Sequence, residues 1–185
     1  MISDTVNDAE RRMTKAVEAA QHDYTSIRTG RANPDLLDKV QVDYYGSTMP
    51  VNQVANISVP EPRLIVIAPW DKAAIAPIER AIIKSDLGLT PNSDGNVIRL
   101  NIPHLTEERR KEMIKVLHKK AEEHRVAVRN IRRDANEELK KLEKSSEVSE
   151  DDVRRGQEQM QKLTDKYIEQ VDKLTHAKEA ELMEV

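Results

Sequence analysis

The sequence predicts an α+β protein in which a long three-helix bundle is interrupted by an inserted small β/α/β domain. Three observations support this fold class. Charged residues make up 34% of the 185-residue chain and aromatic residues only 3%, a composition that suits long helices with one apolar stripe better than a thick globular core. All eight prolines lie between residues 31 and 105. The segments on either side carry apolar residues at helical spacing.

The first 29 residues are expected to form one amphipathic helix. Its apolar positions recur at steps of three and four residues, which places them on one face. They are Ile2, Val6, Ala9, Met13, Ala16, Ala20, Tyr24 and Ile27. Gly30 follows the last of them, and glycine is the residue best suited to a left-handed C-terminal cap. The helix is therefore expected to stop at Gly30.

The inserted segment, residues 32–102, reads as strands around one helix. Residues 40–44 and 97–102 alternate apolar with polar side chains, and residues 64–68 are continuously apolar, so each range is expected to be a strand. Residues 72–85 are expected to form a helix. The pair Asp94 and Gly95 is typical of a hairpin turn.

Two more amphipathic helices are expected after residue 105. The first of them, about 39 residues and roughly 58 Å long at 1.5 Å per residue, has Thr106 as its expected N-cap. The second is expected to open with a capping box formed by Ser149 and Asp152. The two apolar stripes consist of Ile114, Leu117, Ala121, Val128, Ile131, Ala135 and Leu142, and of Val153, Met160, Leu163, Tyr167, Val171, Leu174 and Leu182.

These elements predict two domains. Residues 1–29 and 106–185 form the bundle, because the first helix has only the other two against which to bury its stripe. Residues 30–31 and 103–105 are two short links lying side by side, which should let the domains swing about a restricted axis. The predicted hinge residues are Gly30, Arg31, Pro103, His104 and Leu105.

Composition excludes several classes of function. The chain has no cysteine, which removes disulfide scaffolds, thiolate nucleophiles and cysteine-ligated metal sites. No apolar run is long enough to cross a membrane, and the N-terminus lacks a signal-peptide pattern, so a cytoplasmic protein is expected. The five histidines are scattered, and His124 is expected to be a hydrogen-bonded histidine at the core boundary. With no catalytic motif, we expect neither an enzyme nor a metal site.

Positive charge is concentrated on the middle helix of the bundle. Residues 109–133 hold ten Lys or Arg and three Glu, a local net charge of +7, whereas the whole chain carries −3. Because guanidinium forks suit phosphates and aromatic residues are missing from this face, the RNA backbone is the predicted ligand. The basic side chains that share one side of the helix are Lys111, Lys115, Arg125, Arg129, Arg132 and Arg133.

The alternative is that these arginines pair with carboxylates of the bundle, such as Glu150 or Asp151. The protein would then be a structural coiled-coil adaptor without RNA binding, and the surface of the insert would bind another protein. Affinity for RNA that falls steeply with salt would favour RNA binding, and salt-insensitive binding to a protein would favour the adaptor.

Several motifs together resemble the bacterial ribosome recycling factor family over the full length of the chain. They are residues 27–34 (IRTGRANP), 44–46 (YYG), 85–92 (SDLGLTPN), 105–111 (LTEERRK), 127–136 (AVRNIRRDAN) and 149–152 (SEDD).

The resemblance implies an L-shaped protein similar in outline to transfer RNA. It implies binding to the post-termination ribosome at the subunit interface, through large-subunit ribosomal RNA, with Arg110, Arg129 and Arg132 among the contact residues. It further implies joint action with elongation factor G, which hydrolyses GTP, so that the subunits separate and ribosomes leave messenger RNA. A monomer without a cofactor of its own and without a membrane contact is expected.

Overall fold

The computed structural model describes residues 1–184 and divides the chain into two compact units. Unit 1 consists of Met1–Tyr24 and the segment from Ile114 onward, and unit 2 is the continuous segment Thr25–Met113. These limits, 24/25 and 113/114, differ from the predicted domain limits at 29/30 and 105/106, which stay a prediction. None of the helices in the described part of the chain is long and apolar enough to cross a membrane.

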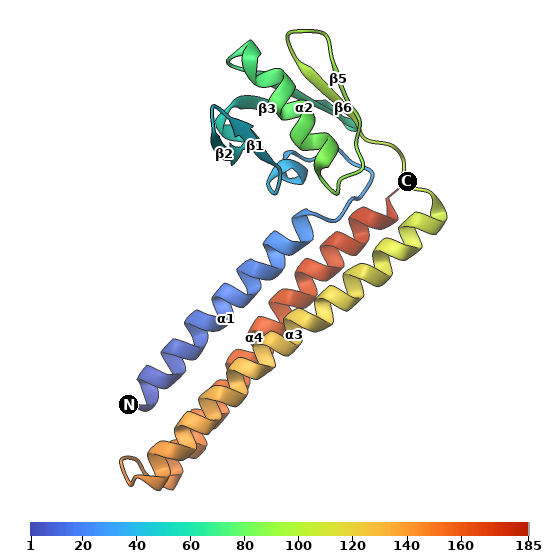
Figure 1. Cartoon of the computed structure of the whole chain (residues 1–185). Coiled ribbons are helices and arrows are strands. Elements are labelled where there is room, and N and C mark those ends of the chain that lie inside the picture. Colours follow the sequence, from blue (N-terminus) through green and yellow to red (C-terminus); the bar gives the residue numbers. More distant parts are fainter. Residues whose placement is uncertain (185) are drawn as a thin grey trace. The chain divides into compact units, whose positions relative to one another are not determined.

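Unit 1 is built by three long helices that run side by side (Figure 1). They are α1 (Ile2–Thr25), α3 (Glu107–Lys144) and α4 (Glu150–Met183), of which α3 begins within unit 2. The stripes predicted from the sequence supply most of the buried core, whose apolar members include Val6, Ala9, Met13, Val128, Ile131, Ala135, Val153, Met160 and Tyr167. Leu139 also belongs to the core but was missed by the prediction, whereas the predicted Leu142 is only partly buried against it. The predicted fold class is therefore confirmed for the bundle.

Polar contacts fix how the three helices face one another. Tyr24 and Thr175 share a buried hydrogen bond of 2.9 Å between α1 and α4. Arg12 of α1 donates to Asp134 of α3 at 3.1 Å. Such pairs form at only one register of the helices, so they select one arrangement among many that bury the same stripes.

Both predicted caps are present. The Thr106 hydroxyl accepts from the backbone N–H of Arg109 at 3.1 Å, and α3 begins one residue later. Ser149 and Asp152 form a reciprocal capping box at the start of α4. The connection between α3 and α4 is short because Ser146 takes a left-handed conformation, with φ of 59°.

The prediction that the first helix stops at Gly30 is wrong. The helix α1 ends at Thr25, although Gly30 does adopt a left-handed φ of 79°. Ile27 is buried in the segment between them, and Arg28 donates to the carbonyl of Leu87 at 3.2 Å. These contacts need an extended path, and they outweigh the local preference for helix.

Unit 2 contains a hairpin, a four-stranded sheet and one helix. The strands β1 (Gln41–Tyr44) and β2 (Ser47–Pro50) pair with each other. The sheet has the order β3-β4-β6-β5 and every neighbouring pair is antiparallel. Its strands are β3 (Ala55–Glu61), β4 (Leu64–Pro69), β5 (Pro91–Ser93) and β6 (Ile98–Asn101).

The core of unit 2 lies on one face of the central strands. Ile65 and Ile67 of β4 stand opposite Leu100 and Ile98 of β6, and all four side chains are fully buried. The helix α2 (Ile75–Lys84) adds Ile78 and Ile82 to this core. The predicted helix over 72–85 is thus confirmed, except that Lys72–Ala74 is a 3₁₀ turn capped by the Asp71 carboxylate.

Three strands, β2, β3 and β5, were not predicted from the sequence. Both β3 and β5 are edge strands and contain a proline each, Pro60 and Pro91. Proline is tolerated at a sheet edge, because the side of the strand that lacks the N–H faces solvent and has no neighbouring strand to which it would donate a hydrogen bond. Reading prolines only as breaks therefore hides these strands. The turn at Asp94 is present and joins β5 to β6.

Candidate nucleic-acid interface

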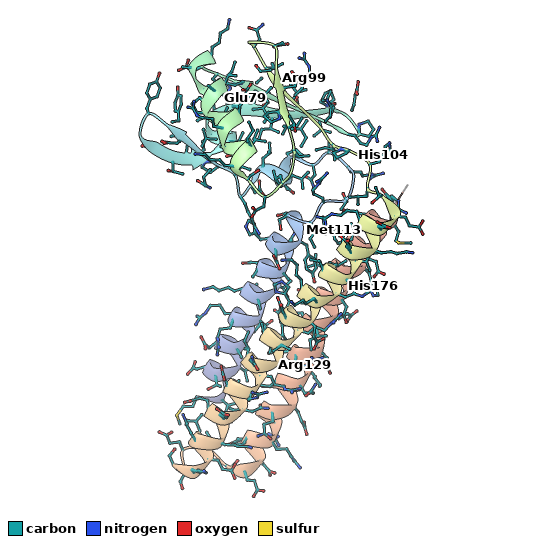
Figure 2. All side chains as sticks on the ribbon, turned by 45° about the vertical axis from the view of Figure 1, so that its right-hand side comes forward. Glu79, Arg99, His104, Met113, Arg129 and His176 are labelled. Atoms are coloured by element: carbon teal, nitrogen blue, oxygen red, sulfur yellow. The ribbon has the colours of Figure 1, made fainter. Side chains whose placement is uncertain are left out.

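The predicted basic residues of α3 fall into two groups. Arg110 and Lys111 belong to unit 2, whereas Lys115, Arg125, Arg129, Arg132 and Arg133 belong to unit 1. The second group lies on the part of α3 that belongs to the bundle, and Figure 2 shows Arg129 about midway along the bundle. The first group carries its own features: Lys111 is exposed beside Glu107 at 3.4 Å, and the Nε atom of Arg110 is buried without a hydrogen-bond partner among the described residues.

Arg125 is engaged inside the bundle. Its Nε donates to Asp172 of α4 at 2.7 Å and its Nη1 donates to Glu122 at 3.2 Å. The hydrogen bond that Arg125 donates to Asp172 is the largest cause of a raised pKa of Arg125. Because the side chain is only 25% exposed, it serves first as a tie between α3 and α4. A phosphate would have to displace Asp172 to reach it.

Arg129 and Arg132 are held but remain accessible. Arg129 donates to Glu122 at 3.1 Å and its side chain is 43% exposed. Arg132 donates to the Gln161 side-chain oxygen of α4 at 3.0 Å, and the amide of Gln161 donates onward to Asp165 at 2.9 Å. Gln161 is neutral, so Arg132 keeps a charge that no carboxylate of residues 1–184 pairs directly.

Arg133 and Lys115 are exposed, and in the described residues neither has an ion pair. We call Arg129, Arg132 and Arg133 the α3 arginine surface. Within it, a single carboxylate, Glu122, accepts from a guanidinium. This arrangement leaves an excess of positive charge with several N–H donors directed by neighbouring side chains, which is what a phosphate backbone requires.

Some partners in this surface escape a reading of the sequence. Glu122 lies seven residues before Arg129, a spacing that the usual rule for helix pairs omits. Gln161, the partner of Arg132, and Asp172, the partner of the neighbouring Arg125, lie on another helix, and only the rotation of α4 brings them to α3. In the described part of the chain, neither Glu150 nor Asp151, the carboxylates expected for a solvated face, forms an ion pair with this surface, and Asp151 instead pairs with Arg154 at 3.5 Å.

His124 is a hydrogen-bonded histidine at the edge of the core, as predicted. Its Nε2 lies 2.9 Å from the Asp23 carboxylate, and its ring meets that of Tyr24 edge-on. Lys120 donates to the same carboxylate at 2.8 Å. Across the described residues, no cluster of histidine and carboxylate side chains could hold a metal ion.

The predicted hinge residues all lie within unit 2. The backbone of Gly30 passes next to Leu105: a Cβ at Gly30 would lie 3.6 Å from the Leu105 nitrogen. The two links are anchored on one turn, between β3 and β4. Ala32 donates to the carbonyl of Pro62 and Ile102 to that of Arg63, both at 2.8 Å.

The chain is similar to known proteins over its whole length. A family model described as "Ribosome recycling factor" matches residues 20–183. The ribosome-recycling factors of Halalkalibacterium halodurans and Heliobacterium modesticaldum are each 60% identical over 185 residues, which is 100% of both chains.

Two solved structures share the fold. The solution structure of a ribosome recycling factor is 47% identical, with a TM-score of 0.82, and the match covers 100% of this chain and 98% of the other. The second is 43% identical, with a TM-score of 0.70 and full coverage of both chains. It is described as models for the T. thermophilus ribosome recycling factor and the E. coli elongation factor G bound to the E. coli post-termination complex.

Proposed function

Because the chain belongs to the ribosome recycling factor family and functions in ribosome recycling, we propose that it binds the ribosome after termination through the α3 arginine surface. There it acts with elongation factor G, as the complex described for its structural relative suggests, to separate the subunits and free the messenger RNA. The observation that carries the RNA contact is the pair Arg129 and Arg132, accessible and oriented by Glu122 and Gln161.

The predicted RNA-binding residues do not contribute equally in this proposal. Arg129, Arg132 and Arg133 bind phosphates of large-subunit ribosomal RNA, and Lys115 extends the surface along α3. Arg125 acts indirectly, because its bond to Asp172 fixes α4 beside α3. Arg110 and Lys111 provide a separate contact from unit 2.

The chain itself works by binding and not by catalysis. It acts as a monomer in the cytoplasm with no cofactor of its own, and the GTP is hydrolysed by elongation factor G. Purified chain incubated with GTP should release no phosphate above background. Phosphate should be released once ribosomes and elongation factor G are added. GTP turnover by the chain alone would contradict this assignment.

Movement between the two units is part of the proposal. The segments at Gly30–Arg31 and at Pro103–Leu105 lead to residues held on the β3–β4 turn, so force applied to the sheet passes through two short connections instead of one tether. Longer flexible insertions at Gly30 and at His104 should leave ribosome binding nearly intact while subunit splitting slows. Splitting at the parent rate would exclude force transmission through these links.

The RNA contact is tested by the double variant Arg129→Ala, Arg132→Ala. We expect ribosome affinity to fall by about 1–3 kcal/mol for each strong contact, and the slope of log affinity against log salt to become shallower by roughly one for each phosphate that is no longer bound. Arg154→Ala is the matched control, since it removes one exposed arginine from α4. Equal affinity of parent and double variant at two salt concentrations would favour the adaptor function instead.

A further inference from the structure

Unit 2 exposes two large aromatic side chains close to one hydrogen bond. Tyr45 is 79% exposed and Trp70 is 70% exposed. Tyr44, next to Tyr45 in the chain, donates its hydroxyl to Asp71 at 2.6 Å, and Asp71 follows Trp70 directly. The hairpin β1–β2 therefore places the Tyr45 side chain by the Asp71 carboxylate, and the exposed Trp70 is the residue that precedes Asp71 in the chain. We call Tyr45, Trp70 and Asp71 the aromatic patch.

The backbone at Tyr45 is strained for that residue. Tyr45 and Gly46 form the two-residue turn of the hairpin with φ of 50° and 78°. Asparagine or glycine adopts this left-handed conformation readily, whereas a tyrosine does so at a cost. The core does not require the side chain either, because it is largely in solvent. An aromatic residue kept in a strained and exposed position indicates a role in binding.

The Tyr45 ring is oriented before any ligand arrives. Its centroid lies 4.4 Å from that of Tyr44, with the rings inclined at 64°. Tyr44 is in turn fixed by its bond to Asp71, and the Asp71 carboxylate also accepts from the backbone N–H of Ala73 at 3.0 Å. Side chains held in this way lose little further freedom on binding.

Asp71 has no cation of its own. Among the described residues no Lys or Arg lies within ion-pair distance of its carboxylate, which is exposed. The hydrogen bond from Tyr44 is the main cause of a lowered pKa of Asp71, so the group is ionised at neutral pH. A negative charge beside exposed ring faces repels phosphate and attracts a cation.

We propose that the aromatic patch is a docking site for an arginine side chain presented by a protein partner. A guanidinium stacks on the face of an aromatic ring and forks its N–H groups onto a carboxylate, so one arginine uses both features of the patch. Unpaired RNA bases would also stack on the rings, but their phosphates would meet Asp71. The inference does not depend on the α3 arginine surface, which belongs to the other unit.

The test uses the full chain and Trp70, its only tryptophan, as the fluorescent reporter. Capped tri-arginine peptide should change the Trp70 emission in a saturable way. Capped tri-lysine carries the same charge without the planar fork and should bind more weakly. Oligouridylate should bind more weakly than either peptide, and stronger binding of oligouridylate would overturn the proposal in favour of an RNA contact.

Three variants assign any binding to the patch. Tyr45→Asn keeps a residue suited to the turn, and Asp71→Asn keeps an oxygen that can cap the 3₁₀ turn. Each should weaken tri-arginine binding by about two- to fivefold, the effect of one exposed cation–π contact or charge pair, and Tyr45→Asn should do so without lowering the melting temperature. Tyr45→Phe keeps the ring and should bind like the parent. Parent-like binding by Tyr45→Asn and Asp71→Asn would overturn the proposal.

A last variant separates this inference from the proposed function. Arg129→Ala, Arg132→Ala should bind tri-arginine like the parent even though its ribosome affinity falls. If that variant keeps its ribosome affinity while Tyr45→Asn loses peptide binding, the RNA contact fails and the docking site stands.

Discussion

Replacing Leu117 by alanine tests whether the predicted stripe of α3 is the true core of the bundle. Leu117 is completely buried, whereas its neighbour Val116 is 39% exposed. Removing the leucine side chain beyond Cβ loses about 2–3 kcal/mol of transfer free energy and leaves a cavity, so we expect the free energy of unfolding to fall by about 3–5 kcal/mol. For a chain of this size each kcal/mol corresponds to about 2–4 °C in melting temperature.

The assay is thermal unfolding followed by circular dichroism at the helix band, to which the three long helices contribute most. Leu117→Ala should lower the midpoint by about 6–20 °C. Val116→Ala on the same turn of α3 is the matched control and should shift it by no more than about 2 °C, because truncation of a partly exposed side chain changes stability by roughly 0.5 kcal/mol. Equal shifts for the two variants would refute the assignment of the buried face.

Three further outcomes are expected. First, the pKa of Asp94 is lowered to about 2, mainly by hydrogen bonds from the backbone N–H groups of Asn96 and Val97. The ionised carboxylate therefore stabilises the fold fully above pH 3.8, the ordinary pKa, and this stabilisation is lost as the pH falls through about 2. Acid unfolding of Asp94→Asn should lack this pH dependence. The pKa of Tyr44 is raised to about 12, chiefly by its bond to Asp71, so Asp71→Asn should bring one tyrosine titration, measured by ultraviolet absorbance, to lower pH. Ser149→Ala removes the capping box of α4 and should cost about 1 kcal/mol in denaturant unfolding, whereas Ser3→Ala should cost almost nothing.

The bundle could be predicted from the sequence because each helix shows its own period. Leu117, Val128 and Met160 lie where the three- and four-residue spacing places them, and the caps at Thr106 and Ser149 follow from residues adjacent in the chain. Interactions of this kind are local, so the information is contained in a short stretch of sequence.

Contacts between elements could not be predicted in the same way. The end of α1 depends on Arg28 reaching Leu87, and the orientation of Arg132 depends on Gln161 of α4. Each of these pairs needs the final rotation of one element against another, which neither segment encodes by itself. The arginine-rich face could therefore be located from the sequence. The sequence could not show that Arg125 is held by Asp172 while Arg129 and Arg132 remain accessible.

The division of the chain also sets an order for folding during synthesis. Unit 2 is continuous, from Thr25 to Met113, and all its strands can pair as soon as that segment has left the ribosome. The apolar stripe of α1 has no partner until the segment after Ile114 has been made. At about 5–20 residues per second, the 89 residues from Thr25 to Met113 take roughly 4–18 seconds to synthesise. During this interval α1 must remain exposed while a finished unit folds beside it, so the first helix made is among the last to become buried.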